Sequence, residues 1–484
     1  MPDDWAGHPL ELELWLGGEG LVRLSTGLQA GLNPMHHRFA VAEQATDGNT
    51  IVIEAEVIPK GIFGTNIPEP RLDRAKFVVP QREVRAFERD LTMLLEVCEH
   101  LAGHDVVPLL LEAAEAALSE LAGSWPTDTA STVSRYVLGY DNGLGAGAGA
   151  VPADWVSEAI DAARPTARTW SLPPAPASLV PLPAEAAEAV TRARSVLAER
   201  LERIKQDYPP VGRLCLTGHA HIDLAWLWPY AETRRKIRRT FSSVLDLMDR
   251  YPDFTFSQSS AQAYAWIEED DPGVFARIME RVAEGRWEPS GRMWLEADCN
   301  LTGGESLVRH LVYGQRYFEQ TFGKRHRVAW LPDVFGFSGG MPQILRGAGI
   351  DGFFTIKMYW NESNLFPYDL FELNSPLVSV PVGAAANDGA AFIDNQEWEP
   401  ELGLGALETA FDGDGLILRL YEPYGRRRPV RIRLGQPIQS VERVDLMEEP
   451  TEAAPIELTD DGPAVRFEVR PFEIVTLRIR PECS

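Results

Sequence analysis

Residues 214–228 read Leu-Cys-Leu-Thr-Gly-His-Ala-His-Ile-Asp-Leu-Ala-Trp-Leu-Trp, and this stretch decides the fold class that we predict. A short apolar strand over residues 214–216 is expected to end directly before a loop with two histidines and an aspartate. Residues two apart in an extended segment project to one face, so His219, His221 and Asp223 can converge on one point. Imidazole and carboxylate groups are ligands for zinc, which predicts a metal site. The alternative is a pair of hydrogen-bonded loop histidines without a metal.

Short apolar strands alternate with helices on the C-terminal side of this loop. The helical patterns cover residues 234–250, 274–285 and 305–322, and the strand patterns cover 254–256, 328–331 and 352–356. This alternation predicts βα units with a parallel sheet or barrel. Barrel enzymes place their catalytic groups at the carboxyl ends of the strands, where the histidine loop is expected to lie.

Two further carboxylates and one aromatic residue are candidates for the same site. Asp298 and Asp333 each occupy a loop after an expected strand, where a carboxylate can ligate a metal, act as a nucleophile or act as a base. A lone loop aspartate is also commonly a helix N-cap, and this alternative stays open for both. Trp226 lies close to Asp223 in the sequence, and an indole face beside carboxylates suits the apolar face of a sugar ring. The alternative is that Trp226 packs in the apolar core.

The sequence patterns divide the chain into four segments. Residues 1–80 read as strands and turns, which predicts an N-terminal β-domain, and residues 81–210 read as a helical spacer with a Gly/Pro-rich linker. Residues 211–372 hold the α/β pattern with the metal site. Residues 373–484 return to alternating strands, which predicts an antiparallel β-sandwich. The predicted class is therefore α/β plus β, with a partial α/β barrel at its centre.

Charge and composition exclude several classes of partner. The formal net charge is −25, which argues against binding to nucleic acid or to an anionic membrane. The basic run at residues 234–239 is expected to be a solvated helix face. The four cysteines form no CxxC pair, which excludes a thiolate zinc knuckle. No apolar run reaches the roughly 18 residues of a spanning helix, and the first residues show no signal peptide, so a cytoplasmic location is predicted.

Five motifs in the α/β segment form a recognisable set. They are Gly218-His-Ala-His-Ile-Asp-Leu-Ala-Trp-Leu-Trp-Pro229, Phe256-Ser-Gln-Ser-Ser-Ala-Gln262, Glu284-Gly-Arg-Trp-Glu-Pro289, the stretch 294–308 and Trp330-Leu-Pro-Asp-Val-Phe-Gly336. Together they resemble the motifs of the glycoside hydrolase family 38 α-mannosidases of the cytosolic and bacterial type. The N-terminal segment and residues 405–480 also resemble β-domains of that family, so the resemblance covers nearly all of the chain.

The resemblance implies a zinc-dependent, retaining α-mannosidase that hydrolyses terminal α-D-mannosides of a mannose-containing oligosaccharide. It implies that His221 and Asp223 ligate the zinc, or another divalent metal, and that Asp298 is both a ligand and the nucleophile. It also implies that Trp226 stacks under the bound mannose and that Asp333 contacts the substrate. Zinc can chelate the vicinal cis hydroxyls of mannose, and retention requires a second carboxyl group about 5 Å from the nucleophile. Whether the chain forms a homo-oligomer stays open.

The chain departs from the family pattern after Glu372. The next residues, Leu373-Asn-Ser-Pro376, already resemble the far C-terminal region of the family, so a large middle segment is missing. The family's fourth zinc ligand is a histidine in a later motif, whereas the last of the nine histidines here is His326. His219 is the nearest substitute as a ligand, and Asp333 is the nearest remaining candidate for the general acid. Two alternatives therefore stand beside the mannosidase: an inactive relative that binds sugar or metal, and another metal-dependent hydrolase of the amidohydrolase type.

Overall fold

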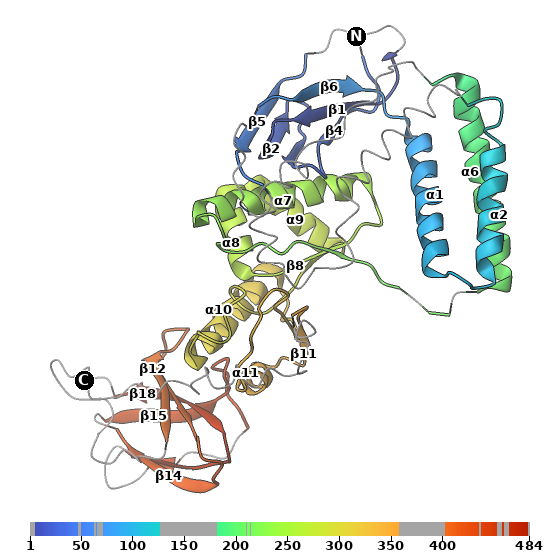
Figure 1. Ribbon diagram of the computed structural model, residues 1–484. Helices are drawn as coiled ribbons and strands as arrows, with labels where there is room; N and C mark the ends of the chain where they lie inside the picture. The colour runs from blue at the N-terminus through green and yellow to red at the C-terminus, as the bar shows by residue number, and fades with distance from the viewer. Residues whose placement is uncertain are drawn as a thin grey trace. The chain divides into compact units, whose positions relative to one another are not determined.

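The computed structural model describes residues 5–46, 50–61, 64, 71–125, 182–209, 211–212, 214–357, 402–434, 437–452, 457–458 and 464–482. The chain divides into two compact units, one with residues 1–216 and 225–251 and the other with residues 217–224 and 252–484 (Figure 1). The Gly/Pro-rich linker and the junction after Glu372 lie outside the described residues. None of the described helices combines the length and the apolar character that crossing a membrane requires.

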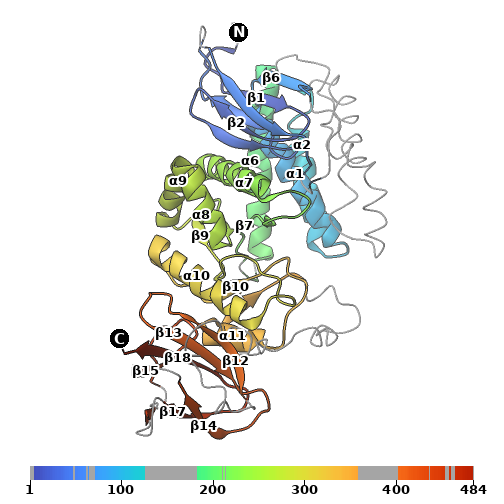
Figure 2. The same ribbon diagram turned by 90° about the vertical axis from the view of Figure 1, so that its left-hand side faces the viewer.

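Six strands form the N-terminal part of the first unit. They are β1 (Leu10–Trp15), β2 (Glu19–Leu24), β3 (Gln29–Leu32), β4 (Arg38–Ala42), β5 (Ile53–Ile58) and β6 (Arg74–Val78). They pair antiparallel into two three-stranded sheets with the orders β4-β1-β6 and β3-β2-β5. Strands β1, β2 and β6 are labelled in Figure 2. Leu12, Val22 and Phe39 come from three different strands and are buried in one shared apolar core. The alternating residues of these strands therefore supply one β-domain with its core.

Among the described residues, three helices follow in the same unit and share a second core. They are α1 (Arg82–His100), α2 (Val106–Ser119) and α6 (Ala184–Asp207). Ala113 and Ala117 of α2 and Ala193 of α6 are almost completely buried in this core. Small alanine side chains at helical spacing allow the helix backbones to approach closely, which explains why an alanine-rich sequence forms a packed helical element here.

Helix α7 (Tyr230–Arg250) belongs to this unit as well and carries the basic run of the sequence. The prediction that this run is a solvated face is wrong for Lys236 and Arg239, which are both buried. The two side chains donate hydrogen bonds of 2.6 Å and 2.8 Å to Oε2 of the buried Glu19, and Arg239 also donates to Glu232 at 2.6 Å. Buried charges require such partners, and the distant Glu19 could not be paired with them from the sequence.

The second unit begins with short parallel strands and helices. The strands are β7 (Gly218–His219), β8 (Phe256–Gln258), β9 (Trp287–Pro289), β10 (Val328–Trp330) and β11 (Gly352–Phe354), and the helices are α8 (Ala261–Asp270), α9 (Pro272–Ala283), α10 (Gly304–Phe322) and α11 (Met341–Gly347). The strands form one sheet in the order β7-β8-β9 and another that pairs β10 with β11. The described residues thus confirm the parallel α/β pattern but show no closed barrel. Closure requires the first and last strands of a sheet to pair, and these two sheets remain separate.

The prediction of a strand over residues 214–216 is also wrong. Leu214 and Leu216 are 81% and 78% exposed, and neither lies in a strand. Pairing starts instead at Gly218, whose N–H donates to the carbonyl of Thr255 over 2.9 Å. The first histidine therefore lies within the paired strand β7 rather than after it.

A buried tyrosine links β8 to β9. The Tyr264 hydroxyl donates to the carbonyl of Gln258 over 3.1 Å and accepts from the indole N–H of Trp287 over 2.9 Å. Tyr264 and Trp287 are both at most 1% exposed. A buried hydroxyl that both donates and accepts is satisfied, so these bonds hold the last residue of β8, the first residue of β9 and helix α8 in one arrangement.

Seven strands at the C-terminus confirm the predicted antiparallel β-sandwich. They are β12 (Gly403–Thr409), β13 (Leu416–Tyr421), β14 (Arg428–Arg433), β15 (Ile438–Val444), β16 (Glu457–Leu458), β17 (Ala464–Val469) and β18 (Ile474–Pro481). The sheets have the orders β12-β13-β18-β15 and β14-β17-β16. Leu418 and Leu420 alternate along β13 and point into a core with Val465 and Leu477, as the two-residue period of the sequence predicts.

Arg419 lies between those two leucines and faces away from their core, yet it is fully buried. Its guanidinium pairs with Glu305 of α10, with Glu408 of β12 at 3.2 Å and with Glu448 at 3.7 Å. Arg309 of α10 also pairs with Glu448, at 2.9 Å. We call these five side chains the Arg419 cluster, and they join α10 of the α/β part to the sandwich.

Candidate metal centre

Three predicted side chains meet after the parallel strands β7 and β10. His221 and Asp223 follow β7, and Asp333 follows β10. One ligand atom of each residue lies within 4.8 Å of the other two. His221 Nε2 is 3.2 Å from Asp223 Oδ1 and 3.5 Å from Asp333 Oδ2. We call this set the His221 group, and its one nitrogen and two oxygens could bind a single divalent ion.

The other ring nitrogen of His221 faces a fourth carboxylate. His221 Nδ1 is 3.4 Å from Glu296 Oε2, and the Ser259 hydroxyl donates to Glu296 Oε1 over 3.0 Å. The Glu296 side chain is only 13% exposed. Sequence analysis did not select Glu296, although it lies two residues before Asp298, and this spacing could have shown that both side chains leave an extended segment on one face.

The carboxylates around His221 determine its charge. Burial lowers the pKa of the imidazole, but the hydrogen bonds and charges of Asp223 and Glu296 outweigh burial and raise the pKa to about 10. The ammonium group of Lys357 pairs with the other oxygen of Asp333, and its side chain is 10% exposed. The carboxylates of this site therefore lie beside two basic side chains, His221 and Lys357.

His219 has a different environment from His221. The indole N–H of Trp330 can only donate, and it lies 3.3 Å from His219 Nε2, so that nitrogen must accept. Nδ1 then carries the proton and donates to the carbonyl of Ser257 over 2.8 Å. Burial lowers the pKa of His219, which favours this neutral form. Both ring nitrogens have partners, so His219 matches the alternative of a hydrogen-bonded histidine without a metal. His219 is therefore poorly suited to replace a missing ligand.

Asp298 lies outside the His221 group. Its carboxylate is exposed, and Oδ1 accepts the backbone N–H groups of Asn300 and Leu301 over 2.8 Å and 2.9 Å. This arrangement is a turn in which the side chain replaces a backbone acceptor, close to the capping role that the sequence left open. The role of Asp298 as ligand and nucleophile stays a prediction.

The tryptophans near the motifs differ in burial. The Trp226 side chain is 59% exposed, and Trp226 belongs to the first unit, so its stacking against a sugar stays a prediction. Trp228 is buried and donates to Thr233 Oγ1 over 3.0 Å. Trp330 stacks on Phe354 with ring centroids 3.9 Å apart. Trp228 and Trp330 therefore have packing roles.

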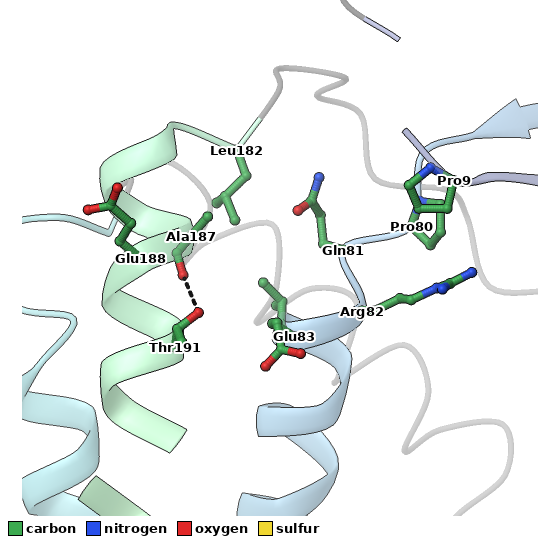
Figure 3. Close-up of a pocket in the computed structure, with 10 residues that line it drawn as sticks. Pro9, Pro80, Gln81, Arg82, Glu83, Leu182, Ala187, Glu188 and Thr191 are labelled. Atoms are coloured by element: carbon green, nitrogen blue, oxygen red, sulfur yellow. Dashed lines mark hydrogen bonds between the residues drawn. The ribbon is translucent and has the colours of Figure 1, made fainter. Parts of the chain in front are cut away.

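Two of the cavities among the described residues lie apart from the His221 group. One of about 300 Å³ lies at the starts of α1 and α6, and its lining includes Pro80, Glu83 and Thr191 (Figure 3). The other, of about 310 Å³, is lined in part by Arg292 and Arg327. Neither lining contains a residue of the His221 group, so the site candidate rests on the convergence of ligand atoms and not on these cavities.

Comparison with known proteins agrees with the motifs. Residues 212–375 match the glycosyl hydrolases family 38 N-terminal domain, and residues 402–477 match the family 38 C-terminal beta sandwich domain. The chain is 47% identical over 159 residues to Alpha-mannosidase G of Dictyostelium discoideum, which is 33% of this chain and 15% of that protein. It is 47% identical over 155 residues to human Alpha-mannosidase 2C1, which is 32% of this chain and 15% of that protein.

The similarity to solved structures is more limited in extent. An alpha-mannosidase from Enterococcus faecalis V583 is 25% identical over 29% of this chain and 16% of that chain, with a TM-score of 0.27. The matched region of this chain thus spans about one seventh of the length of the curated relatives it matches.

Proposed function

The chain carries the N-terminal domain of glycosyl hydrolase family 38 and the C-terminal beta sandwich domain of that family, and on that premise we propose that it is a metal-dependent α-mannosidase. Its substrate would be the terminal α-D-mannoside of a glycan, and its metal would be zinc. Hydrolysis with retention of configuration, a cytoplasmic location and the four-segment domain division at residues 80, 210 and 372 belong to the same proposal. The relatives named Alpha-mannosidase support the substrate class.

The single observation that carries the proposal is the convergence of the His221 group. An imidazole nitrogen and two carboxylate oxygens are the donor types that zinc takes in catalytic sites. Three protein ligands leave a coordination position for water or substrate, which distinguishes a catalytic zinc from a closed structural one. His221 Nε2 faces both Asp223 and Asp333, so these three residues fit a zinc ion and would hold it.

When bound, zinc would supply a Lewis acid that holds and polarises sugar hydroxyls. The protein residues have separate tasks. His221 would present Nε2 without its proton, and Glu296 would retain the proton on Nδ1. Asp298 would attack the anomeric carbon as the bond from that carbon to the aglycone oxygen breaks, since its carboxylate is exposed and its Oδ2 is not used by the turn. The aglycone would leave with a proton from solvent, and a water molecule would then displace Asp298 from the anomeric carbon and release mannose with retained configuration. Lys357 would hold Asp333 in place through the oxygen that faces away from His221.

One observation favours a second candidate function. Asp298 is not a member of the group that would hold the ion, and the last histidine of the sequence is His326, so a fourth ligand from the family's later motif is absent. Such a chain would bind zinc and mannose without turning the sugar over. The distinction depends on whether Asp298 reaches the anomeric carbon of a bound mannoside.

A combined measurement of zinc content and of p-nitrophenyl α-mannoside hydrolysis tests both candidates. We expect one zinc per chain in the wild type, loss of zinc in His221→Ala and no loss in His100→Gln, which replaces an exposed histidine of α1. For the enzyme, Asp298→Asn should keep the zinc and abolish turnover. Zinc binding with no turnover in the wild type would support the binding protein. Wild-type protein that is folded, free of zinc and inert would refute both.

A further inference from the structure

We propose that Glu296 is the positioning residue of His221, which holds the ring so that Nε2 faces Asp223 and Asp333. This inference rests on the proposed metal site and extends it beyond the ligands. A histidine ring can present either nitrogen to a metal, and the hydrogen bond at the other nitrogen selects which one. In this protein the selecting group would be a buried carboxylate.

The two edges of the His221 ring contact different carboxylates. Nε2 faces Asp223 at 3.2 Å and Asp333 at 3.5 Å, whereas Nδ1 faces Glu296 at 3.4 Å. The two ring nitrogens lie on opposite edges of the imidazole. A proton held on Nδ1 by Glu296 therefore leaves the Nε2 lone pair directed at the two aspartates, as a ligand requires.

Glu296 is itself held by a second buried side chain. Ser259 is 2% exposed, and its hydroxyl donates to Glu296 Oε1 over 3.0 Å. Oε2 is buried and has no hydrogen-bond partner among the described residues, and His221 Nδ1, 3.4 Å away, is the one basic nitrogen within 4.0 Å of it. A buried carboxylate oxygen without a hydrogen bond is costly, so an Nδ1–H of His221 directed at Oε2 would satisfy it.

The neighbouring histidine shows what a purely structural arrangement looks like in the same segment. His219 donates from Nδ1 to a backbone carbonyl, and its Nε2 accepts from Trp330. His221 has carboxylates in both places. A carboxylate behind the ring raises the basicity of the ligating nitrogen, whereas in His219 the indole N–H of Trp330 occupies the nitrogen that a metal would need.

Zinc affinity of the full chain, measured by competition with a chromophoric chelator, tests the inference. Loss of an outer carboxylate typically weakens metal binding by about 10- to 100-fold, and we expect a loss in that range for Glu296→Ala. Glu296→Gln should recover part of the affinity, because its amide oxygen still accepts from Nδ1–H. The matched control is Glu288→Gln, which removes a carboxylate 3.5 Å from Nδ1 of another histidine, His326.

A second measurement reports the ring itself. Nitrogen-15 NMR of the zinc-loaded protein, with the signals assigned by their loss in His221→Ala, should show Nδ1 protonated and Nε2 bound to the metal. In Glu296→Ala we expect a mixture of the two ligating nitrogens. If Glu296→Ala does not fold, Ser259→Ala, which removes only the hydroxyl that holds Glu296, should give a smaller loss of affinity in the same direction.

The outcomes separate this inference from the proposed function. A Glu296→Ala protein that is folded, binds zinc within about twofold of the wild type and keeps its Nε2 ligation would overturn the positioning role while the metal site stands. Zinc binding that His221→Ala leaves unchanged would overturn the metal site itself, and the positioning role with it.

Discussion

Substitution of Arg419 by Met should destabilise the second unit more than any exposed charge substitution. The guanidinium is fully buried and pairs with three carboxylates, of which Glu448 has a side chain only 1% exposed. Met keeps the apolar volume but leaves three acidic groups facing Arg309 alone. Removal of one partner from a buried ion pair costs about 3–5 kcal/mol, and we expect a loss of that size in the opening free energy of the sandwich.

Hydrogen exchange measured by mass spectrometry suits this test, because it reports the opening free energy of β13 and β18 peptides separately from the first unit. The control is Arg427→Met in the same sandwich. Arg427 pairs with Glu468 at 3.8 Å, and both side chains are more than 60% exposed, so its loss should cost less than about 1 kcal/mol. An Arg419→Met effect no larger than that of Arg427→Met would refute the view that the cluster fixes α10 to the sandwich.

Three further perturbations follow from buried groups of the second unit. Burial raises the pKa of Glu305 to about 7, so the stability contributed by its protonation is complete below the unfolded pKa near 4.5 and is lost as the pH rises through about 7. Glu305→Gln should therefore reduce the fall in unfolding free energy between pH 5 and pH 8 in urea titrations. Burial lowers the pKa of His326 to about 4, so the stability contributed by its neutral form is present above the unfolded pKa near 6.5 and is lost as the pH falls through about 4. Acid unfolding of His326→Asn should therefore begin at lower pH than that of the wild type, and an unchanged midpoint would contradict this. A Cβ at Gly314 of α10 would lie 2.7 Å from the backbone nitrogen of Trp294, so Gly314→Ala should lower the unfolding free energy by about 1–3 kcal/mol. The shift of this segment should move Glu296 and weaken zinc binding. A Gly314→Ala protein with the melting temperature and zinc affinity of the wild type would contradict this.

The sequence predicted those elements whose residue period reflects burial directly. The alternation in β13 and β18 buries Leu418, Leu420 and Leu477, because one face of each strand covers the sandwich core. The parallel α/β order of the second unit was predicted from the same kind of pattern. The partial barrel of the same prediction is not seen among the described residues, because closure depends on which strands pair at the edges and not on the period within any one strand.

The site was predictable to the extent that it is local. His221 and Asp223 come from one loop and do face one another, whereas the partner of His219 is an indole more than a hundred positions away. Lys357 was missed because an amine in a loop carries no periodic signal, whereas Glu296 was missed although its two-residue spacing from Asp298 offered one. Their roles depend on strands from separate motifs ending at the same edge.

The buried charges show the same limit in another form. Lys236 and Arg239 read as part of a basic, solvated stretch, and only the fold shows that Glu19 neutralises them. A local charge pattern predicts exposure when no partner is near in sequence, and it fails where the chain brings a distant carboxylate onto the helix.

Anomalous diffraction at the zinc absorption edge, from crystals of the full chain grown with zinc, tests whether the His221 group binds zinc. We expect one strong peak within bonding distance of His221 Nε2, Asp223 and Asp333, with Glu296 hydrogen-bonded to His221 Nδ1. A peak bounded by other side chains, or no peak at this group in crystals that contain zinc elsewhere, would contradict it.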